Sequence, residues 1–236
     1  MIEIIPSETR GSANHGWLDS KHSFSFADYY DPGRMGFGPL RVINEDKVEP
    51  SKGFGTHPHR DMEILTYVID GELEHKDSMG NGSTIRPGDV QRMTAGTGVL
   101  HSEFNPSTEN RTHFLQIWIL PEKNGLAPSY EQTYFGDEKK RNRWCLLGSR
   151  DGREGSVSIH QDVELSATVL DAGTAIDYAF AEGRRGYLQL VSGCLTIRTE
   201  GREDRLEAGD GVALEGIGLL KVRADEESEL LLFDMK

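Results

Sequence analysis

The stretch that decides the fold is GFGTHPHRDMEILTYVIDGELEHKDSMGN at residues 53–81, together with MTAGTGVLHSEFNP at residues 93–106. It carries two pairs of metal-ligand residue types at i, i+2 spacing, His57 with His59 and His101 with Glu103. Side chains two residues apart on a β-strand point to the same face, so two neighbouring strands can aim four ligands at one point. The stretch therefore predicts a metal site built on strands.

Short β-type runs recur on both sides of this stretch and are separated by turn signals such as Asp70-Gly71 and Pro87-Gly88-Asp89. The aromatic and glycine-rich segment 14–40 shows no period and is interpreted as an ordered covering loop. No long amphipathic helix is indicated. The predicted strands are 41–44, 64–69, 72–77, 89–94, 101–105, 113–120, 144–147, 163–170, 187–191, 195–199, 219–223 and 229–234. Many short strands with such turns predict an all-β barrel or sandwich.

An internal repeat divides the chain into two. YVIDGELE (67–74) resembles QLVSGCLT (189–196), and RPGDV (86–90) resembles EAGDG (207–211) at nearly the same distance downstream. Two copies of one all-β unit explain the length better than one large barrel. The copies are expected to join in the charged segment 136–143, which gives predicted domains of residues 1–135 and 136–236.

The second copy lacks the ligands. Counting back from Gly193, as the histidines precede Gly71, reaches Ala179 and Ala181. Counting forward from Gly209 places the counterparts of His101 and Glu103 at Lys221 or Val222 and at Arg223 or Ala224. Histidines needed only to pack the unit would be expected in both copies. The histidines of the first copy are therefore assigned to chemistry.

The motif Gly53-x3-His57-x-His59-x3-Glu63-x7-Gly71, followed by Gly88-Asp89 and Gly96-x4-His101, resembles the two motifs of the cupin superfamily. The surrounding sequence is similar to the pirin family of bicupins, particularly its bacterial quercetin 2,3-dioxygenases. The resemblance implies two jelly-roll β-barrels in tandem, of which the first binds metal and the second is degenerate. It also implies the ligand set His57, His59, His101 and Glu103.

Two carboxylates compete for the fourth ligand position, because the general cupin motif often uses the residue that stands here as Glu63. Glu103 is preferred, since it shares a strand face with His101 whereas Glu63 lies four residues past His59 and would need a bend. Three imidazoles and a carboxylate suit a divalent transition metal and, in an octahedral site, leave two positions open. Fe(II) is the first choice, and Ni, Mn, Co, Cu or Zn would also accept these ligands.

Other residues near the motifs keep two interpretations. His15, His22 and His75 either line the pocket or make structural hydrogen bonds. Aromatic side chains of the covering segment either wall an aromatic-substrate pocket or pack that segment onto the barrel. These aromatic residues are Trp17, Phe24 and Phe26.

The resemblance implies an oxidoreductase that cleaves a flavonol such as quercetin with O2 and releases carbon monoxide and a depside ester. Glu103 would act as the base that takes the proton of the substrate's 3-hydroxyl. The main alternative is a pirin-like metal-binding regulatory protein that acts through a protein partner. A third alternative is a cupin that does not use dioxygen, such as a sugar isomerase, which fits the ligands but not the surrounding sequence.

The 236 residues carry a net charge of −13, which repels phosphate backbones and anionic lipid headgroups, so neither nucleic acid nor membrane is an expected partner. Cys145 and Cys194 form no C-x-x-C motif and are expected to be free thiols. The first residues, MIEIIPSETR, contain no apolar leader pattern. A cytoplasmic location is the resulting expectation.

Overall fold

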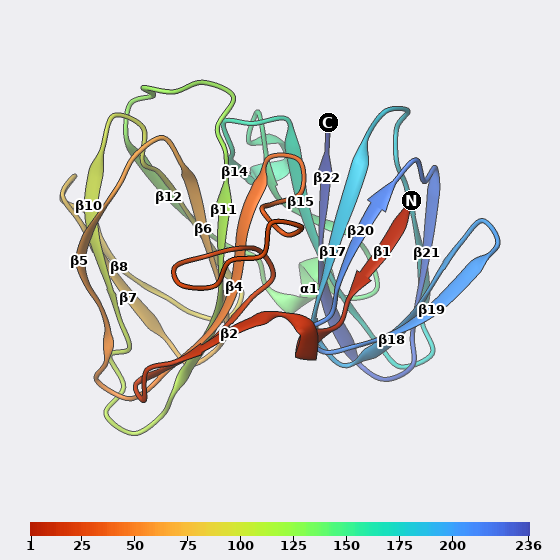
Figure 1. Ribbon diagram of the computed structural model, residues 1–236, viewed down its shortest axis with the longest axis horizontal. Coiled ribbons are helices and arrows are strands. Elements are labelled where there is room, and N and C mark those ends of the chain that lie inside the picture. Colours follow the sequence, from red (N-terminus) through yellow and green to blue (C-terminus); the bar gives the residue numbers. More distant parts are fainter. The chain divides into compact units, whose positions relative to one another are not determined.

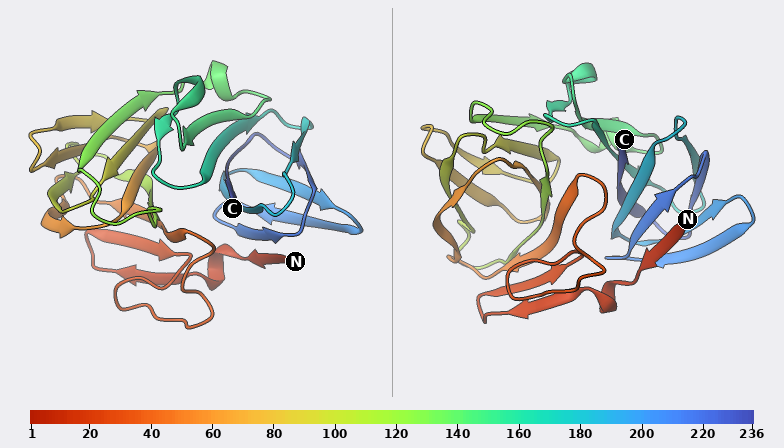
Figure 2. Two further views of the ribbon diagram at one scale, coloured as in Figure 1. Left: turned by 90° about the horizontal axis from the view of Figure 1, so that it is seen from above. Right: turned by 45° about the horizontal axis from the view of Figure 1, so that its top comes forward.

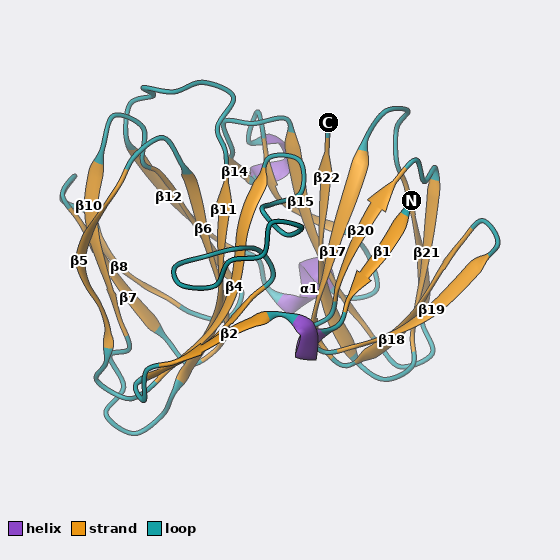
Figure 3. Cartoon of the chain, viewed as in Figure 1, coloured by secondary structure: helices purple, strands orange, loops and turns teal.

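The computed structural model describes residues 1–236 and is built almost wholly from β-strands, as predicted (Figure 1, Figure 3). The chain forms two compact units. The first, here called the site unit, comprises Gly11–Tyr134 and Val157–Gln161. The second, the repeat unit, comprises Met1–Arg10, Phe135–Ser156 and Asp162–Lys236. The helical elements are the 3-10 turns η1 (Ser7–Thr9) and η2 (Arg153–Gly155) and the helix α1 (Asp137–Lys140). None of the helices is long and apolar enough to cross a membrane.

The site unit contains two antiparallel sheets that curve around one interior (Figure 2). The larger sheet has the strand order β12 (Ser129–Tyr134), β9 (Asp89–Thr94), β6 (Glu63–Asp70), β11 (Thr112–Ile119), β4 (Leu40–Val48), β3 (Leu18–His22), β2 (Gly11–Asn14). The smaller has the order β5 (Gly53–His59), β10 (Val99–Phe104), β7 (Leu73–Asp77), β8 (Gly82–Ile85). The short strand β14 (Val157–Ser158) also belongs to this unit.

The repeat unit has the same plan. The strands of its larger sheet that belong to this unit run in the order β1 (Ile2–Ile5), β20 (Gly211–Glu215), β17 (Arg185–Ser192), β22 (Ser228–Met235), β15 (Val163–Leu170), β13 (Cys145–Ser149). Its smaller sheet runs β16 (Ala175–Ala179), β21 (Leu219–Ala224), β18 (Cys194–Thr199), β19 (Arg202–Glu207). The order β9-β6-β11-β4 thus recurs as β20-β17-β22-β15, and β5-β10-β7-β8 recurs as β16-β21-β18-β19. The tandem of two related barrels is confirmed.

The repeated glycines occupy the same turn in both units. Gly71, between β6 and β7, has φ +79°, and Gly193, between β17 and β18, has φ +83°. A side chain at either position would meet the carbonyl that precedes a long strand, Arg111 O before β11 and Glu227 O before β22. Only glycine combines this left-handed backbone with so close an approach. The turn therefore explains the sequence similarity that revealed the repeat.

The first ten residues pack with the second half of the chain. β1 pairs with β20 in the repeat unit, where Ile2 lies opposite Leu214 and Ile5 opposite Gly211. In the same way, segment 157–161 belongs to the site unit. The compact units therefore differ from domains of residues 1–135 and 136–236 in these two segments, although both divisions change near residue 135.

The segment predicted as a covering loop, residues 14–40, contains the strand β3 and starts at the last residue of β2. These two strands form the edge of the larger sheet, and residues 15–17 and 23–39 have irregular backbone apart from isolated bridges. β3 was missed because its inward side chains include Ser20 and His22, so that buried positions are polar and the expected alternation of apolar residues is hidden. β5 escaped the strand prediction for a similar reason, because GFGTHPH is rich in glycine, proline and histidine.

The interior of the site unit has an apolar end and a polar middle. Leu18, Val48, Val68 and Phe114 pack together as one buried cluster with Leu73 and Ile85. Two residues further along four adjacent strands, the inward side chains become polar. These residues are Ser20 on β3, Asp46 on β4, Thr66 on β6 and Gln116 on β11. The strands thus carry a buried polar layer directly above an ordinary core.

Gly193 provides a test of the repeated turn. An alanine Cβ there would lie 2.3 Å from Glu227 O, so Gly193→Ala is expected to lower the free energy of unfolding by about 1–3 kcal/mol beyond the Gly173→Ala control. Gly173 has nearly the same φ, +81°, but nothing lies within 4 Å of its added Cβ. Urea unfolding of both variants measures the difference, and equal losses would mean that backbone conformation alone explains the glycine.

Candidate metal centre

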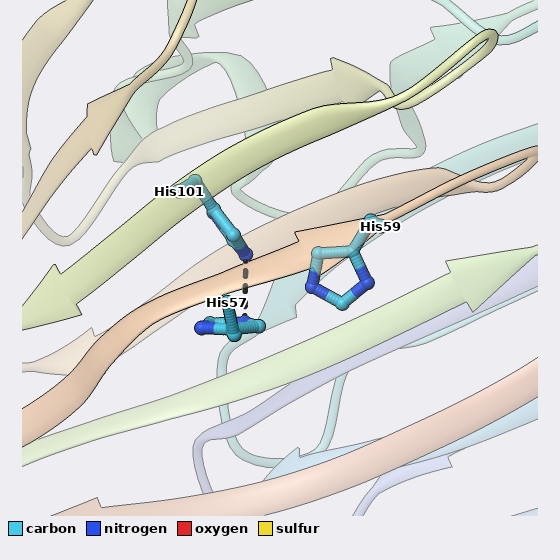
Figure 4. Close-up of side chains that lie close together, drawn as sticks. All are labelled: His57, His59 and His101. Atoms are coloured by element: carbon cyan, nitrogen blue, oxygen red, sulfur yellow. Dashed lines mark hydrogen bonds between the residues drawn. The ribbon is translucent and has the colours of Figure 1, made fainter.

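Three histidines from two adjacent strands converge at one point of the site unit. His57 and His59 lie on β5 and His101 lies on β10, and the two strands pair so that His101 is opposite His57. The ring centroids are 4.4–4.8 Å apart, and one ligand nitrogen of each ring lies within 4.8 Å of the others (Figure 4). The structure thus brings together the three histidines that the sequence predicted as ligands.

The closest contact in this triad joins two ring nitrogens. Nε2 of His57 lies 3.0 Å from Nε2 of His101. His57 is oriented by its other nitrogen, Nδ1, which is 2.8 Å from the carbonyl oxygen of Gly55 and must donate to it. A neutral His57 then has a lone pair on Nε2, aimed at His101. A divalent metal ion fits this arrangement, because it accepts lone pairs from several imidazoles at once.

Burial keeps two of the histidines uncharged. The pKa of His59 is lowered to about 4 by burial and by the neighbouring His57. The pKa of His101 is lowered to about 2, again chiefly by burial and then by His57 and His59. Neutral imidazole is the form that binds metal. Near neutral pH both rings therefore offer lone pairs without first losing a proton.

Glu103 lies two residues beyond His101 on the same face of β10 and is 2% exposed. Its two carboxylate oxygens accept hydrogen bonds from Gln116 Nε2 at 3.0 and 2.9 Å. Burial raises the pKa of Glu103 to about 7, although the bonds from Gln116 and Thr66 oppose the rise. Glu103 lies within 4.8 Å of His101 and lines one cavity with His57 and His59. Glu103 is therefore positioned to contact a metal ion or ligand bound at the triad.

The competing carboxylate, Glu63, faces the other side of its sheet. Along β6 the side chain of Thr66 points into the interior, where its hydroxyl lies 3.5 Å from Glu103 Oε1. Glu63, three residues away on the strand, has the opposite orientation. Its Oε2 accepts from Thr94 Oγ1 at 3.1 Å and from the backbone N–H of His160 at 3.2 Å. Glu63 is therefore a buried structural acceptor in this fold and is separate from the histidine triad.

A cavity opens beside the triad between the two sheets. It is lined by His57, His59 and Glu103 together with Ala13, His15, Leu18, Ser20, His22, Phe26, Ala27, Asn44, Asp46, Phe54, Gln116 and Trp118. Of the residues with two interpretations, His15, His22 and Phe26 are on this wall. Trp17 instead packs edge-on against Phe54 at 5.3 Å, and Phe24 is buried elsewhere.

Several wall residues were missed from the sequence, chiefly Asp46, Gln116 and Trp118. The sequence nevertheless contains a signal that could have identified them. Asp46 and Gln116 interrupt the apolar alternation of two long strands at buried positions, and they are 4% and 8% exposed. Trp118 follows Gln116 on the same face and packs edge-on against His59 at 4.9 Å. A polar residue at an interior strand position thus marked the cavity.

The repeat unit fills the equivalent positions with core residues. In the site unit Glu103 pairs with His75, which lies four residues after the turn glycine Gly71. In the repeat unit the residue four positions after Gly193 is Ile197, so the residue paired with Ile197 is the counterpart of Glu103. That counterpart is Val222, so Leu220, two residues earlier, corresponds to His101. Tyr178 lies opposite Leu220 and takes the position of His57, and Phe180 takes the position of His59. These residues all belong to or pack against the unit's apolar cluster. Counting along the sequence gave Ala179 and Ala181, one residue away from the register that the sheets adopt.

Comparison with known proteins agrees with this geometry. A family model described as Pirin matches residues 6–119, and one described as quercetinase C-terminal cupin domain matches residues 146–235. A quercetin 2,3-dioxygenase from Escherichia coli is 48% identical over 235 residues, which cover 100% of this chain and 99% of that protein. The chain belongs to the pirin family.

Other pirin relatives match over the same full length. A putative quercetin 2,3-dioxygenase from Pseudomonas aeruginosa is 44% identical over all of both chains, and a pirin-like protein from Caulobacter vibrioides is 40% identical over 99% of each. Among solved structures, a bacterial pirin from E. coli in complex with nickel(II) superposes with a TM-score of 0.93, at 48% identity and 100% and 99% coverage.

Loss of one triad member tests the metal assignment. His59→Ala is expected to reduce the metal that survives desalting from about one ion per chain to a small fraction of that, because it removes one of the four proposed ligands. His113→Ala is the matched control, since His113 lies on β11 and contacts Glu45 instead of the triad. Elemental analysis after desalting measures the difference, with circular dichroism to establish folding. Full metal content in a folded His59→Ala protein would overturn the assignment.

Asp46 gives a prediction for the metal-free protein. Burial raises its pKa from 3.8 to about 7; the bond from Ser20 lowers it and the charge of Glu103 raises it further. Because the folded state holds this proton more tightly, the stabilisation is fully present below about pH 3.8 and is lost as the pH rises through about 7. Asp46→Asn cannot ionise. Between about pH 5 and pH 8 the wild type should lose about 1–3 kcal/mol more unfolding free energy than the variant, measured in urea with chelator. Parallel pH profiles would contradict this assignment of the buried proton.

Proposed function

We propose that this chain is a metal-dependent dioxygenase that cleaves flavonols such as quercetin with O2 and releases carbon monoxide. The observation that carries the proposal is the lining of the cavity, which combines two histidines of the triad, His57 and His59, and the buried Glu103 carboxylate with aromatic rings. Full-length relatives at 48% and 44% identity that are named for this reaction support it. The reaction consumes one dioxygen and yields one carbon monoxide and a depside ester.

His57, His59 and His101 would hold the metal ion, and Glu103 is the proposed fourth ligand. When bound, a divalent transition metal supplies the Lewis-acid and redox chemistry that lets a flavonol oxygen and dioxygen react. Fe(II) is the proposed ion, and a relative's nickel complex keeps nickel as the next choice. The donor set alone does not select between them, because imidazole suits both metals.

Glu103 is the proposed base for the substrate's 3-hydroxyl. Its carboxylate is fixed by Gln116, which donates to both oxygens and prevents the side chain from rotating away. In the metal-free protein burial raises the pKa of Glu103 to about 7, a value matched to proton transfer at neutral pH. Glu103 would therefore take the hydroxyl proton, and the three histidines would hold the metal ion.

The cavity wall suits a flat ligand that carries hydroxyl groups. Phe26, Phe54 and Trp118 supply aromatic faces, and Ser20 with Asp46 supplies buried hydrogen-bonding groups. The enclosed space is about 110 Å³, smaller than the roughly 300–1,000 Å³ of sites that enclose drug-sized ligands. Entry of a flavonol thus requires a wall to move. The irregular segment 23–39, which contributes Phe26 and Ala27, is the proposed moving part.

Oxygen uptake and carbon monoxide release by the metal-loaded protein test this function directly, with quercetin and related flavonols as substrates. Glu103→Gln is expected to lower kcat by about 10²–10⁴-fold, the usual contribution of a general base. Glu63→Gln is the matched control, since it makes the same substitution at a buried carboxylate that faces the outer side of the larger sheet, and it should retain turnover.

Two results would contradict the proposal. If iron- and nickel-loaded wild-type protein consume no dioxygen with any flavonol, the activity is wrong. If Glu63→Gln loses turnover while Glu103→Gln keeps it, with both proteins folded and loaded, then the role assigned to Glu103 is wrong although the reaction stands.

A further inference from the structure

A second hydrogen-bonded chain lies behind His101, on the side away from His57. His101 Nδ1 is 3.4 Å from Nδ1 of His75, which is fully buried on β7. The other nitrogen of His75, Nε2, is 3.2 Å from Oδ2 of Asp77. Tyr130 covers the His75 ring, with centroids 5.0 Å apart, so the ring is held on its face as well as at both nitrogens.

The far end of this chain is fixed by a turn. Oδ1 of Asp77 accepts from the backbone N–H groups of Met79 at 2.9 Å and Asn81 at 3.0 Å. Oδ2 accepts from Asn81 Nδ2 at 2.9 Å in addition to His75. Every neighbour of the carboxylate is a donor. Asp77 is therefore an acceptor only, and its orientation is set by the backbone between β7 and β8.

These partners determine which nitrogens carry protons. Because Asp77 only accepts, His75 must carry its proton on Nε2, which leaves a lone pair on Nδ1. His101 must then carry its proton on Nδ1 to donate to His75. The remaining lone pair of His101 is on Nε2, the atom that faces His57 and the triad. The turn at Asp77 thus selects the donor atom that His101 presents to a metal.

We propose that His75 and Asp77 are positioning residues for the metal site, which hold His101 in the tautomer and orientation that present the Nε2 lone pair. Partners of this kind behind a ligating histidine raise its basicity and commonly contribute 10–100-fold, roughly, to metal affinity. The inference concerns metal binding and does not depend on which substrate the metal serves. It also explains why a histidine remote from the cavity wall is completely buried.

A different role for His75 is open to the same test. His75, His101 and Glu103 also lie within 4.8 Å of one another and form a second group of ligand residue types. If His75 bound the metal itself, its Nδ1 would need a lone pair aimed at an ion instead of at the His101 N–H. Replacement of His75 by Asn and by Leu separates these roles, since the two side chains have nearly the same shape. Asn places an oxygen where Nδ1 stands, and Leu places a methyl group there.

The first experiment uses Asp77→Asn. If the amide keeps its oxygen toward Met79 and Asn81, its NH2 group faces His75 and reverses the chain, so that His75 accepts on Nε2 and His101 is left with its proton on Nε2. We expect ¹⁵N NMR of histidine-labelled, metal-free protein to show His101 protonated on Nδ1 in the wild type and on Nε2 in the variant. Nickel(II) affinity, measured by competition with a chelator, should fall about 10–100-fold. Asn81→Ala removes one donor to Asp77 but leaves the carboxylate, so it should keep the wild-type tautomer.

The second experiment compares His75→Asn with His75→Leu at equal folding. Asn retains an acceptor for the His101 N–H and should hold nickel(II) nearly as well as the wild type, whereas Leu should bind about 10–100-fold more weakly. The proposal is overturned if Asp77→Asn leaves the His101 tautomer and the affinity unchanged, or if Asn and Leu weaken binding equally. Neither readout uses a flavonol, so failure of the dioxygenase assignment would leave these results interpretable.

Discussion

The 3.0 Å approach of His57 Nε2 to His101 Nε2 is the constraint on which the rest of the site depends. The series of contacts that contains it ends in an acceptor on both sides, the carbonyl of Gly55 beyond His57 and the carboxylate of Asp77 beyond His75. If each of the three rings in this series, His57, His101 and His75, carries a single proton, the three outer contacts use all three protons. The contact between His57 and His101 is left with two lone pairs, which only a cation can satisfy. The two facing nitrogens are thus left free to bind a cation, because the ring protons are held at the other nitrogens.

Burying these polar groups has an energetic cost, which a comparison of equivalent positions in the two units shows. In the site unit Gln116 lies opposite Thr66 in the sheet, and both are buried beside the Glu103 carboxylate. In the repeat unit the same register places Leu232 opposite Leu188, both fully buried. Burying a polar group stabilises a fold less than burying leucine and is tolerated only when every group is paired. One barrel plan therefore supports both an ordinary core and a polar interior, and the choice depends on a few inward positions.

Much of this was predictable from the sequence, for physical reasons that also mark the limit. His57, His59 and His101 could be found because i, i+2 spacing on a strand is a local property. The repeat could be found because a left-handed turn demands glycine at both Gly71 and Gly193. The partners of Glu103 could not, since Gln116 and Thr66 come from strands whose adjacency and register are set by the whole sheet. The exchange of β1 into the repeat unit depends on the same long-range pairing.

The two sheets contribute different residues to the site, and this difference indicates which strands determine substrate choice. The smaller sheet carries the donor atoms, on β5 and β10, and behind them the His75 chain on β7 fixes the donor atom of His101. The larger sheet supplies the facing wall through β3, β4 and β11, with Ser20, Asp46 and Trp118 lining the cavity. Changing a donor residue alters metal binding first and substrate choice only as a consequence. Substitutions on the larger sheet can change the shape and polarity of the wall while the donors stay in place. We therefore expect substitutions that change substrate specificity to fall on the larger sheet, where LDSKH and LRVINEDKV place the polar Ser20 and Asp46 beside core residues such as Leu18 and Val48.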